Sequence, residues 1–213
     1  MTEKHLHIEI TSDFNCPWCE VGRHRLDKAL KALPPTVSYE IYWKPFFLYK
    51  IPADGLSWTD HMQKRWGLFF YSSLILYFNP MFPSLGSSNP VWYVSMANEV
   101  EAEGIDIKHY CSKFVNTVDP HRICELAYEK LGWKAGRALH DRLMKAYFSE
   151  ATDIMDPAIL LAEGVKVGLD EETIQKMLAD KDGKQRFEKD VIKKQMRARI
   201  NGVPYFVING CVF

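Results

Sequence analysis

The 213 residues provide enough chain for one domain, or for one domain that carries a sizeable insertion. Hydrophobic residues make up 47% and charged residues 25% of the sequence, which is typical of a folded chain and excludes a disordered one. The 27 basic and 27 acidic residues cancel, and this zero net charge argues against nucleic acids or anionic membranes as partners.

The five cysteines are too few and too irregularly spaced for the disulfide framework of a small secreted protein. The N-terminus runs directly into the alternating segment 6–10, without a basic region and an apolar stretch, so we expect no signal peptide. The most apolar long segment, residues 66–82, is short for a membrane span and is interrupted by Pro80. We therefore expect a buried helix and loop there, and a cytoplasmic protein with reduced thiols.

The first fifty residues have the pattern of a strand, a helix and a second strand. Residues 6–10 alternate apolar and polar side chains, which predicts a short strand that ends in a turn at 13–15. A helix is expected from the proline at position 17 to about Leu33, before two prolines. Residues 37–47 are rich in β-branched and aromatic side chains, which favour a strand. This order predicts a right-handed βαβ unit.

The pattern from about residue 51 to residue 184 is helical with short breaks. Helices are expected over 91–103 and 120–131, and two more are expected to begin at the capping residues Asp156 and Asp170. A charged helix follows at 184–200. Near the C-terminus, Asn209-Gly210 stands between two apolar runs, which is the strongest short signal for a β-hairpin.

The segment Cys16-Pro17-Trp18-Cys19 is the clearest chemical feature of the sequence. Two cysteines with two residues between them can form a reversible disulfide where a strand leads into a helix. The free N–H groups and partial positive charge of the helix N-terminus favour a thiolate at Cys16. Cys19, one turn deeper, is placed to attack a mixed disulfide at Cys16 and to release the substrate. We therefore expect Cys16 as the nucleophile, Cys19 as the resolving thiol, and Pro17 and Trp18 as residues that tune the pair.

A zinc half-site and a pair of structural thiols are the alternatives for these two cysteines. A zinc site needs two more ligands, but His24 is the only close candidate and no second Cys-x-x-Cys occurs. A Cys-x-x-Cys beside a βαβ pattern, in a chain without secretory features, indicates redox chemistry more often than a metal site. We therefore expect no metal here.

Val203-Pro204 precedes the last apolar run, although proline is unusual at the start of a strand because it cannot donate to the ladder. A cis peptide there would bend the chain and place the Val203 backbone beside the dithiol, where a substrate strand would pair. An ordinary edge-strand proline is the simpler interpretation of this dipeptide alone. Because the dipeptide occurs in a chain with an N-terminal Cys-x-x-Cys, we favour a substrate-binding role for Val203 and Pro204.

With these motifs the chain resembles the DsbA family of thioredoxin-like dithiol oxidoreductases, and most closely its FrnE-like cytoplasmic branch. The resemblance covers nearly the full length. Its segments are the active-site stretch 13–19, Asn116-Thr117 followed by His121-Arg122, Ala146-Tyr147-Phe148 with Asp153, and the strand 202–206.

The resemblance implies an α/β architecture, namely a thioredoxin-like fold interrupted by a helical insertion domain. Residues 1–50 and 185–213 would form the discontinuous thioredoxin-like domain, and residues 51–184 the insertion. The resemblance also implies an active disulfide between Cys16 and Cys19, a cis proline at Pro204, and His121 at the rim of the substrate site.

Two features depart from the family pattern. Family members continue past the hairpin into another helix, whereas this sequence stops at Phe213, so either the sequence is truncated or the last helix is missing, which would expose part of one sheet face. The dipeptide between the cysteines is Pro17-Trp18, and Trp18 cannot supply the charge with which a histidine stabilises a thiolate. The oxidising strength of the family therefore does not transfer to this chain.

The remaining cysteines have simpler explanations than a second site. His109, Cys111, His121 and Cys124 include the residue types of a four-ligand zinc site. We favour buried thiols and core or capping histidines, and a disulfide between Cys111 and Cys124 is a lesser alternative. Cys211 follows the hairpin turn and is expected to pack, and the aromatic residues between 58 and 92 are expected to be mostly core.

The sequence thus predicts a thiol–disulfide oxidoreductase that acts on protein or small thiol and disulfide substrates, with glutathione as one candidate. It needs no cofactor besides its own redox-active disulfide. Two alternatives stay open. One is a glutathione-dependent transferase or isomerase of the kappa-class or hydroxychromene-carboxylate isomerase type, although those relatives generally carry serine where Cys16 stands. The other is a non-catalytic binding module with a zinc half-site. The oligomeric state and the direction of electron flow are not predicted.

Overall fold

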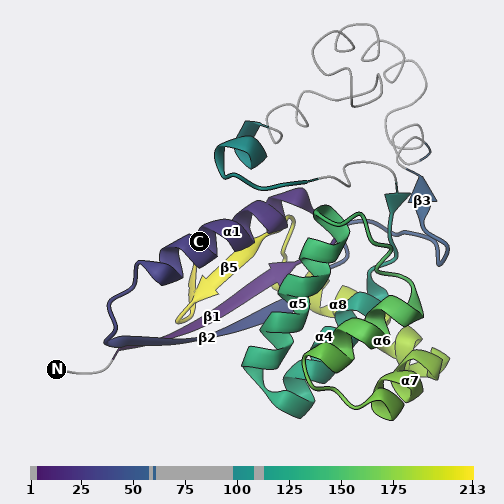
Figure 1. Ribbon diagram of the computed structural model, residues 1–213. Helices are drawn as coiled ribbons and strands as arrows, with labels where there is room; N and C mark the ends of the chain where they lie inside the picture. Colours follow the sequence, from purple (N-terminus) through teal and green to yellow (C-terminus); the bar gives the residue numbers. More distant parts are fainter. Residues whose placement is uncertain (1–3, 58–59, 61–97, 108–112) are drawn as a thin grey trace, which may run out of the picture.

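A four-stranded sheet in the order β2-β1-β5-β6 lies at the centre of the computed structural model, which describes residues 4–57, 60, 98–107 and 113–213 (Figure 1). Strand β1 (Lys4–Ser12) is parallel to β2 (Val37–Pro45) and antiparallel to β5 (Tyr205–Ile208). β5 turns back into β6 (Cys211–Val212). This mixed sheet with helices packed on it is the α/β, thioredoxin-like fold that the sequence predicted.

Helix α1 (Pro17–Lys31) connects β1 to β2, so the predicted strand–helix–strand order is confirmed. Ile8 of β1 lies opposite Ile41 of β2, and Ile10 lies opposite Trp43. These four side chains are buried and form one cluster with Leu30 of α1. Residues two apart on a strand share a face, so the alternation that predicted β1 also determines which face α1 covers.

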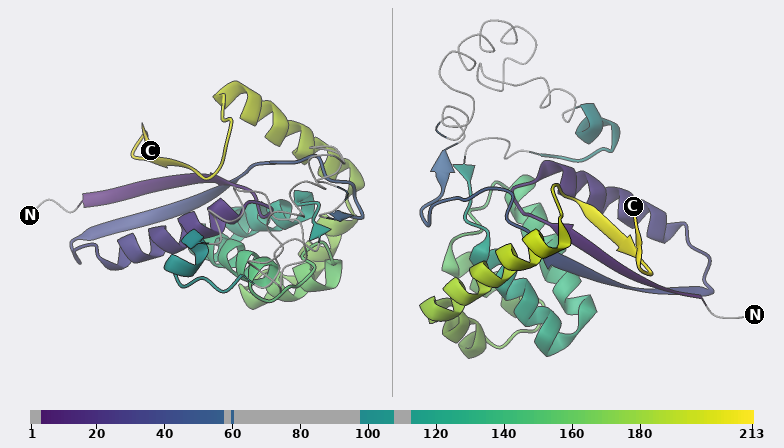
Figure 2. Two further views of the ribbon diagram at one scale, coloured as in Figure 1. Left: turned by 90° about the horizontal axis from the view of Figure 1, so that it is seen from above. Right: turned by 180° about the vertical axis from the view of Figure 1, so that it is seen from behind.

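Five helices follow between β4 and β5: α4 (Val118–Leu131), α5 (Trp133–Phe148), α6 (Pro157–Lys166), α7 (Glu171–Ala179) and α8 (Lys181–Ala198). Figure 2 shows α1, α4 and α5 on one side of the sheet and α8 on the other. A second apolar cluster joins the active-site turn to these helices and includes Phe14, Ile123, Leu139, Leu143 and Leu160.

Local sequence signals for element ends are confirmed by the structure. The Asp156 carboxylate accepts a hydrogen bond from the N–H of Ala158, and the Asp170 carboxylate accepts one from the N–H of Thr173, so both cap their helices as predicted. In the hairpin between β5 and β6, Asn209 and Gly210 have φ values of 50° and 81°. These left-handed conformations are the ones that this dipeptide tolerates.

The structure differs from the predicted elements in three places. β1 extends two residues beyond the predicted strand at each end, and α5 was not predicted as a separate helix. Within the segment expected to be helical, β3 (Leu56–Ser57) pairs antiparallel with β4 (Lys113–Phe114). A two-residue strand is too short for a periodic pattern, and the paired residues lie 56 and 58 positions apart, so no local signal predicts this pair.

Several predictions fall wholly or partly outside the described residues. These are the segment 66–82, the aromatic residues between 58 and 92, His109 with Cys111, and residues 91–97 of one expected helix, whose described part is helical over 98–102. None of the described helices is long and apolar enough to cross a membrane. The division into two domains stays a prediction, and residue 184 lies inside α8.

Candidate active site

Cys16 and Cys19 lie together at the N-terminus of α1. Cys16 is the last residue before the helix and has an extended backbone, and Pro17 occupies the first turn. The N–H of Cys19 donates a hydrogen bond to the carbonyl of Cys16 at 3.0 Å. Both side chains are free thiols, and they are 3% and 0% exposed. The helix N-terminus therefore acts on Cys16, whereas Cys19 lies one turn inside the protein.

The two thiols differ in their electrostatic environment. Burial raises the pKa of Cys19 well above its usual range, and a hydrogen bond to the Cys16 sulfur and the charge of that sulfur raise it further. Cys19 therefore keeps its proton at neutral pH and donates it toward Cys16. Burial thus keeps the inner sulfur as a neutral thiol.

A clamp with buried hydrogen bonds holds the turn that precedes the cysteines. The Asn15 amide donates to the Val115 carbonyl at 2.8 Å, and the Val115 N–H donates to the Asn15 side-chain oxygen at 3.0 Å. The Tyr147 hydroxyl lies 3.4 Å from the same Asn15 oxygen and donates to the Lys113 carbonyl at 2.9 Å. These bonds tie the active-site turn to the segment that leads into α4.

Asp13 closes the other side of the turn. Its carbonyl accepts the N–H of Cys16 at 3.0 Å, and its carboxylate accepts the N–H of Leu48 at 2.7 Å. His121 lies behind it, 3% exposed, with Nε2 at 3.7 Å from the Asp13 carboxylate and its ring 4.7 Å from that of Phe14. The structure thus brings His121 to the active-site turn from inside the protein, and its role toward a substrate stays a prediction.

The segment before β5 brings Val203 and Pro204 to the dithiol. The Val203–Pro204 peptide is cis, as the sequence predicted. The Cys16 thiol donates to the Val203 carbonyl at 3.4 Å, across 187 positions of sequence. Gly22 of α1 faces this segment, and a Cβ there would lie 3.0 Å from the Pro204 side chain. Glycine thus lets α1 approach the cis proline closely.

A mostly apolar groove of about 730 Å³ extends from this point along α1 and β5. Trp18 and Val21 of α1 line it on one side, and Val203, Pro204 and Phe206 line it on the other. Trp18, Val203 and Pro204 therefore share one concave surface next to Cys16.

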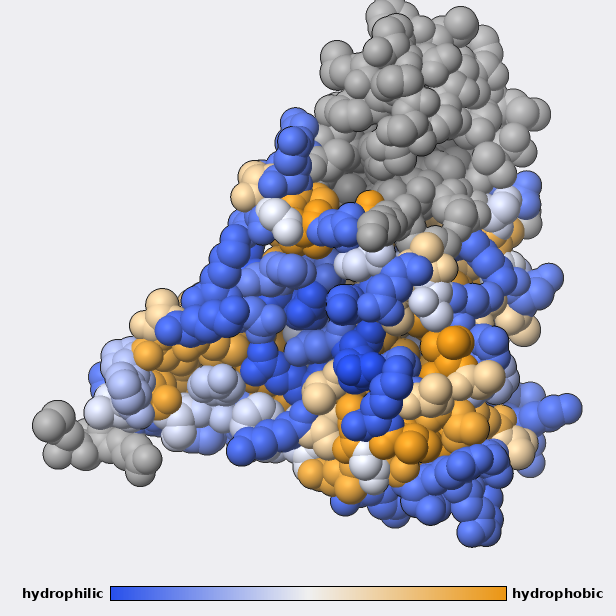
Figure 3. Space-filling model, in the orientation of Figure 1, coloured by the Kyte–Doolittle hydropathy of each residue, from blue (hydrophilic) through white to orange (hydrophobic). Residues whose placement is uncertain are grey.

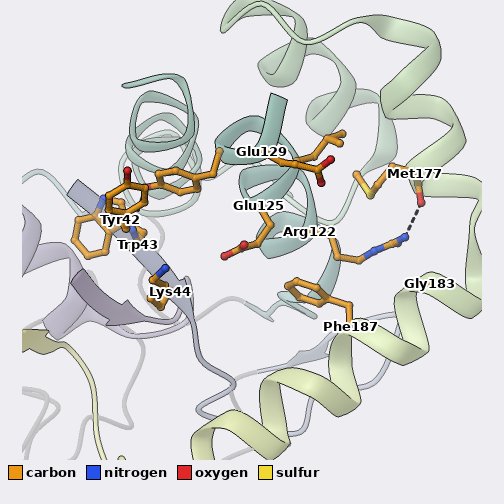
Figure 4. Close-up of a pocket in the computed structure, with 11 residues that line it drawn as sticks. Tyr42, Trp43, Lys44, Arg122, Glu125, Glu129, Met177, Gly183 and Phe187 are labelled. Carbon is orange, nitrogen blue, oxygen red and sulfur yellow. Dashed lines mark hydrogen bonds between the residues drawn. The ribbon is translucent and has the colours of Figure 1, made fainter. Parts of the chain in front are cut away.

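A second cavity, of about 540 Å³, lies between β2, α4, α7 and α8 (Figure 4). Its lining contains no cysteine and includes Lys44, Glu125 and Arg122. The Arg122 guanidinium donates to the carbonyls of Met177 and Asp180 and pairs with Asp119. Arg122, a member of the predicted His-Arg signature, thus ties α4 to α7 and to the start of α8.

Charged side chains cover the junction of α1 and α5, where Figure 3 shows a hydrophilic surface. Arg137 of α5 pairs with Asp27 of α1. In the first turn of α1, burial opposes the charge of Glu20, but hydrogen bonds from Arg23 and His24 outweigh it and lower the pKa of this carboxyl to about 2. His24 lies 3.2 Å from the Glu20 carboxylate. No group of three or more side chains that could bind a metal occurs in the described part of the chain.

Two features of the site were missed by the sequence analysis. The Asn15–Val115 clamp joins residues 100 positions apart, so no spacing indicates it. Ser12, at the end of β1, is fully buried, and its side chain lowers the pKa of Cys19. Ser12 continues the two-residue spacing of Ile8 and Ile10 along β1. This spacing could have indicated its burial, because it places the side chain on the face that α1 covers.

Comparison with known proteins assigns the family. Residues 7–213 match the DSBA-like thioredoxin domain, so the chain belongs to this family. It is 26% identical over 216 residues to YwbO of Bacillus subtilis (strain 168), an uncharacterized protein, with 97% of this chain and 88% of that protein covered.

Solved structures share the fold. A probable DsbA oxidoreductase, SCO1869 from Streptomyces coelicolor, superposes with a TM-score of 0.68 at 24% identity, covering 96% of this chain and 81% of the other. A 2-hydroxychromene-2-carboxylate isomerase superposes with a TM-score of 0.59 at 15% identity, covering 97% and 87%. At these identities the likeness concerns the fold alone.

Proposed function

We propose that this protein is a thiol–disulfide oxidoreductase whose redox-active pair is Cys16 and Cys19. The observation that carries the proposal is the placement of two free thiols within hydrogen-bond reach of each other at the start of α1. Cys16 is the N-cap residue of α1, and burial keeps a proton on Cys19. A metal-binding module would require no such difference between the two sulfurs.

The chemistry follows from these positions. The Cys16 thiolate attacks a substrate disulfide, forms a mixed disulfide with one sulfur and releases the other as a thiol. Cys19 then loses its proton, attacks the Cys16 sulfur and expels the second substrate sulfur, which takes up a proton. The substrate gains two electrons and the enzyme pair becomes a disulfide, and the reverse sequence oxidises a dithiol.

The substrate class that we propose is a protein or small thiol or disulfide, with glutathione as a candidate. The groove supports this class because its walls are mostly apolar and because Val203, whose carbonyl accepts the Cys16 thiol, lines it. Val203 and Pro204 would bind the substrate chain, and His121, which is buried, would act on the substrate site from behind the active-site turn. The sequence motifs support membership of the FrnE-like branch of the family. The few, irregularly spaced cysteines support a location in the cytoplasm.

The sulfur at position 16 separates this proposal from a glutathione-dependent isomerase. The pairing of a sulfur at 16 with a second thiol at 19 supports redox cycling rather than the activation of glutathione by a hydroxyl. Glutathione conjugation that persists in Cys19→Ser would favour the transferase instead. Stoichiometric zinc in the purified protein, without a titratable dithiol, would favour the binding module.

The test is a pair of variants in an insulin-reduction assay. We expect Cys16→Ser to abolish activity, because the nucleophile is lost, and Cys19→Ser to trap mixed disulfides at Cys16. Cys211→Ser is the matched control, because this thiol is exposed and lies in the hairpin. Full activity in Cys16→Ser contradicts the proposal. Equilibration of the wild type in glutathione buffers, followed by tryptophan fluorescence, gives the reduction potential and hence the favoured direction.

A further inference from the structure

Ser12 is a polar residue in an apolar position. It is the last residue of β1 and lies on the same face as Ile8 and Ile10, which pack against α1. Its side chain is 0% exposed, and its hydroxyl makes no hydrogen bond to the residues that the structure describes. A buried hydroxyl without a partner destabilises a fold, so the sheet alone gives no reason for serine here.

The Cys19 sulfur, in the first turn of α1, belongs to a side chain that is also 0% exposed. Burial and the Cys16 sulfur raise the pKa of this thiol, whereas the Ser12 side chain and the backbone of Asp13 lower it. The Ser12 hydroxyl thus acts on the Cys19 sulfur, although it forms no hydrogen bond with the resting thiol. A neutral thiol is a weak acceptor, and a thiolate is a strong one. The interaction with Ser12 thus becomes strong only when Cys19 is ionised.

We propose that the Ser12 hydroxyl stabilises the Cys19 thiolate during the resolving step. The proposal rests on the function proposed above. In this step Cys19 gives its proton to water and its sulfur bonds to Cys16, while the bond between Cys16 and the substrate sulfur breaks. The leaving substrate thiolate takes a proton from water. Ser12 transfers no proton, because its hydroxyl only donates a hydrogen bond to the sulfur once Cys19 is ionised.

The neighbouring carboxylate of Asp13 already has other partners. The Asp13 carboxylate accepts the N–H of Leu48 at 2.7 Å and lies 3.7 Å from His121. Asp13 therefore presents its backbone to Cys19, and its carboxylate to other partners. Ser12, by contrast, is fully buried, and its hydroxyl has no other partner among the described residues, so it is available to the resolving sulfur.

The experiment separates the two thiol reactions in time. Dithiobis(nitrobenzoate), an aromatic disulfide, releases one coloured thiolate when Cys16 attacks it and a second when Cys19 resolves the mixed disulfide. The experiment uses a variant in which the other three of the five cysteines are replaced by alanine, so that only Cys16 and Cys19 can react. Stopped-flow absorbance then gives the rate of each phase as a function of pH.

We expect Ser12→Ala to leave the first phase unchanged and to slow the second about tenfold at neutral pH, the effect of one hydrogen bond to a charged group. The pH profile of the second phase moves upward by about one unit, so high pH restores the rate. Ser12→Thr, which keeps a hydroxyl, retains more of the second-phase rate than Ser12→Ala. Thr11→Val is the control, because it removes a hydroxyl from the neighbouring position on the opposite face of β1.

Several outcomes overturn the proposal. They are an unchanged second phase in Ser12→Ala, an equal slowing in Thr11→Val, or a first phase that slows in parallel. A wild-type protein that never releases the second thiolate contradicts the dithiol function itself, so the two failures are distinguishable. Urea unfolding checks the fold, and Ser12→Ala is expected to be at least as stable as the wild type because it loses an unpartnered buried hydroxyl.

Discussion

The clamp between Asn15 and Val115 is expected to support both the stability of the fold and the geometry of the dithiol. Val115 is 1% exposed, and its N–H and carbonyl both bond to the Asn15 side chain. Asn15→Ala leaves these two backbone groups buried without partners, and each such group costs roughly 1–3 kcal/mol. We therefore expect Asn15→Ala to lower the free energy of unfolding by about 2–5 kcal/mol.

Urea unfolding followed by circular dichroism measures this loss, with the transition slope checked for equality between variants. Asn15→Asp adds a sign test. Its carboxylate still accepts the Val115 N–H but faces the Val115 carbonyl with negative charge, so this variant is destabilised at neutral pH. It recovers as the pH falls and the carboxyl gains a proton to donate. Gln175→Ala, at an exposed position of α7, is the control and changes stability by less than about 0.5 kcal/mol.

The reasoning is refuted by a loss of less than about 1 kcal/mol in Asn15→Ala, because one unpaired buried group alone should exceed it. A second measurement links the clamp to function. The turn that Asn15 holds ends at Cys16, so the reduction rate of the dithiol should fall in Asn15→Ala at temperatures where the variant remains folded.

Two more predictions concern α1. Gly22→Ala should keep the free energy of unfolding within about 1 kcal/mol of the wild type, because the gain in helix propensity offsets a tight contact at 3.0 Å to the Pro204 side chain. It should nevertheless slow substrate reduction. Gly202→Ala, with open space around the glycine, is the control, and equal reduction rates in the two variants contradict the prediction. Glu20→Gln should lose about 3 kcal/mol at pH 7, since bonds from Arg23 lower the pKa of the buried carboxyl from 4.5 to about 2. That stabilisation is present above pH 4.5 and lost toward pH 2, so unfolding curves at several pH values should converge with those of the wild type in acid.

Local sequence signals were sufficient for most of the elements, α5 and the β3–β4 pair excepted, and for the cysteines themselves. The helix N-terminus at Pro17, the capping Asp156 and the turn at Asn209 each depend on neighbours within a few positions, and the structure has them where the sequence indicates. The tertiary supports were not predictable in this way. Asn15 reaches Val115 across 100 positions and Cys16 reaches Val203 across 187, so their pairing depends on the packing of the insertion and the sheet.

Unpartnered buried polar groups gather at the active-site turn and behind it. In the described structure a buried polar side-chain atom without a hydrogen bond occurs in Ser12, Trp43, His121, His140 and Asp141. Trp43 stacks on His140. The rings of both histidines contact Phe14 in the active-site turn, and Ser12 ends the strand that leads into it. Each such group lowers stability compared with an apolar residue of the same shape. Their concentration around one turn is expected where a fold gives up stability for chemistry. We therefore expect His140→Phe to raise the free energy of unfolding and to lower the rate at which the dithiol reduces its substrate.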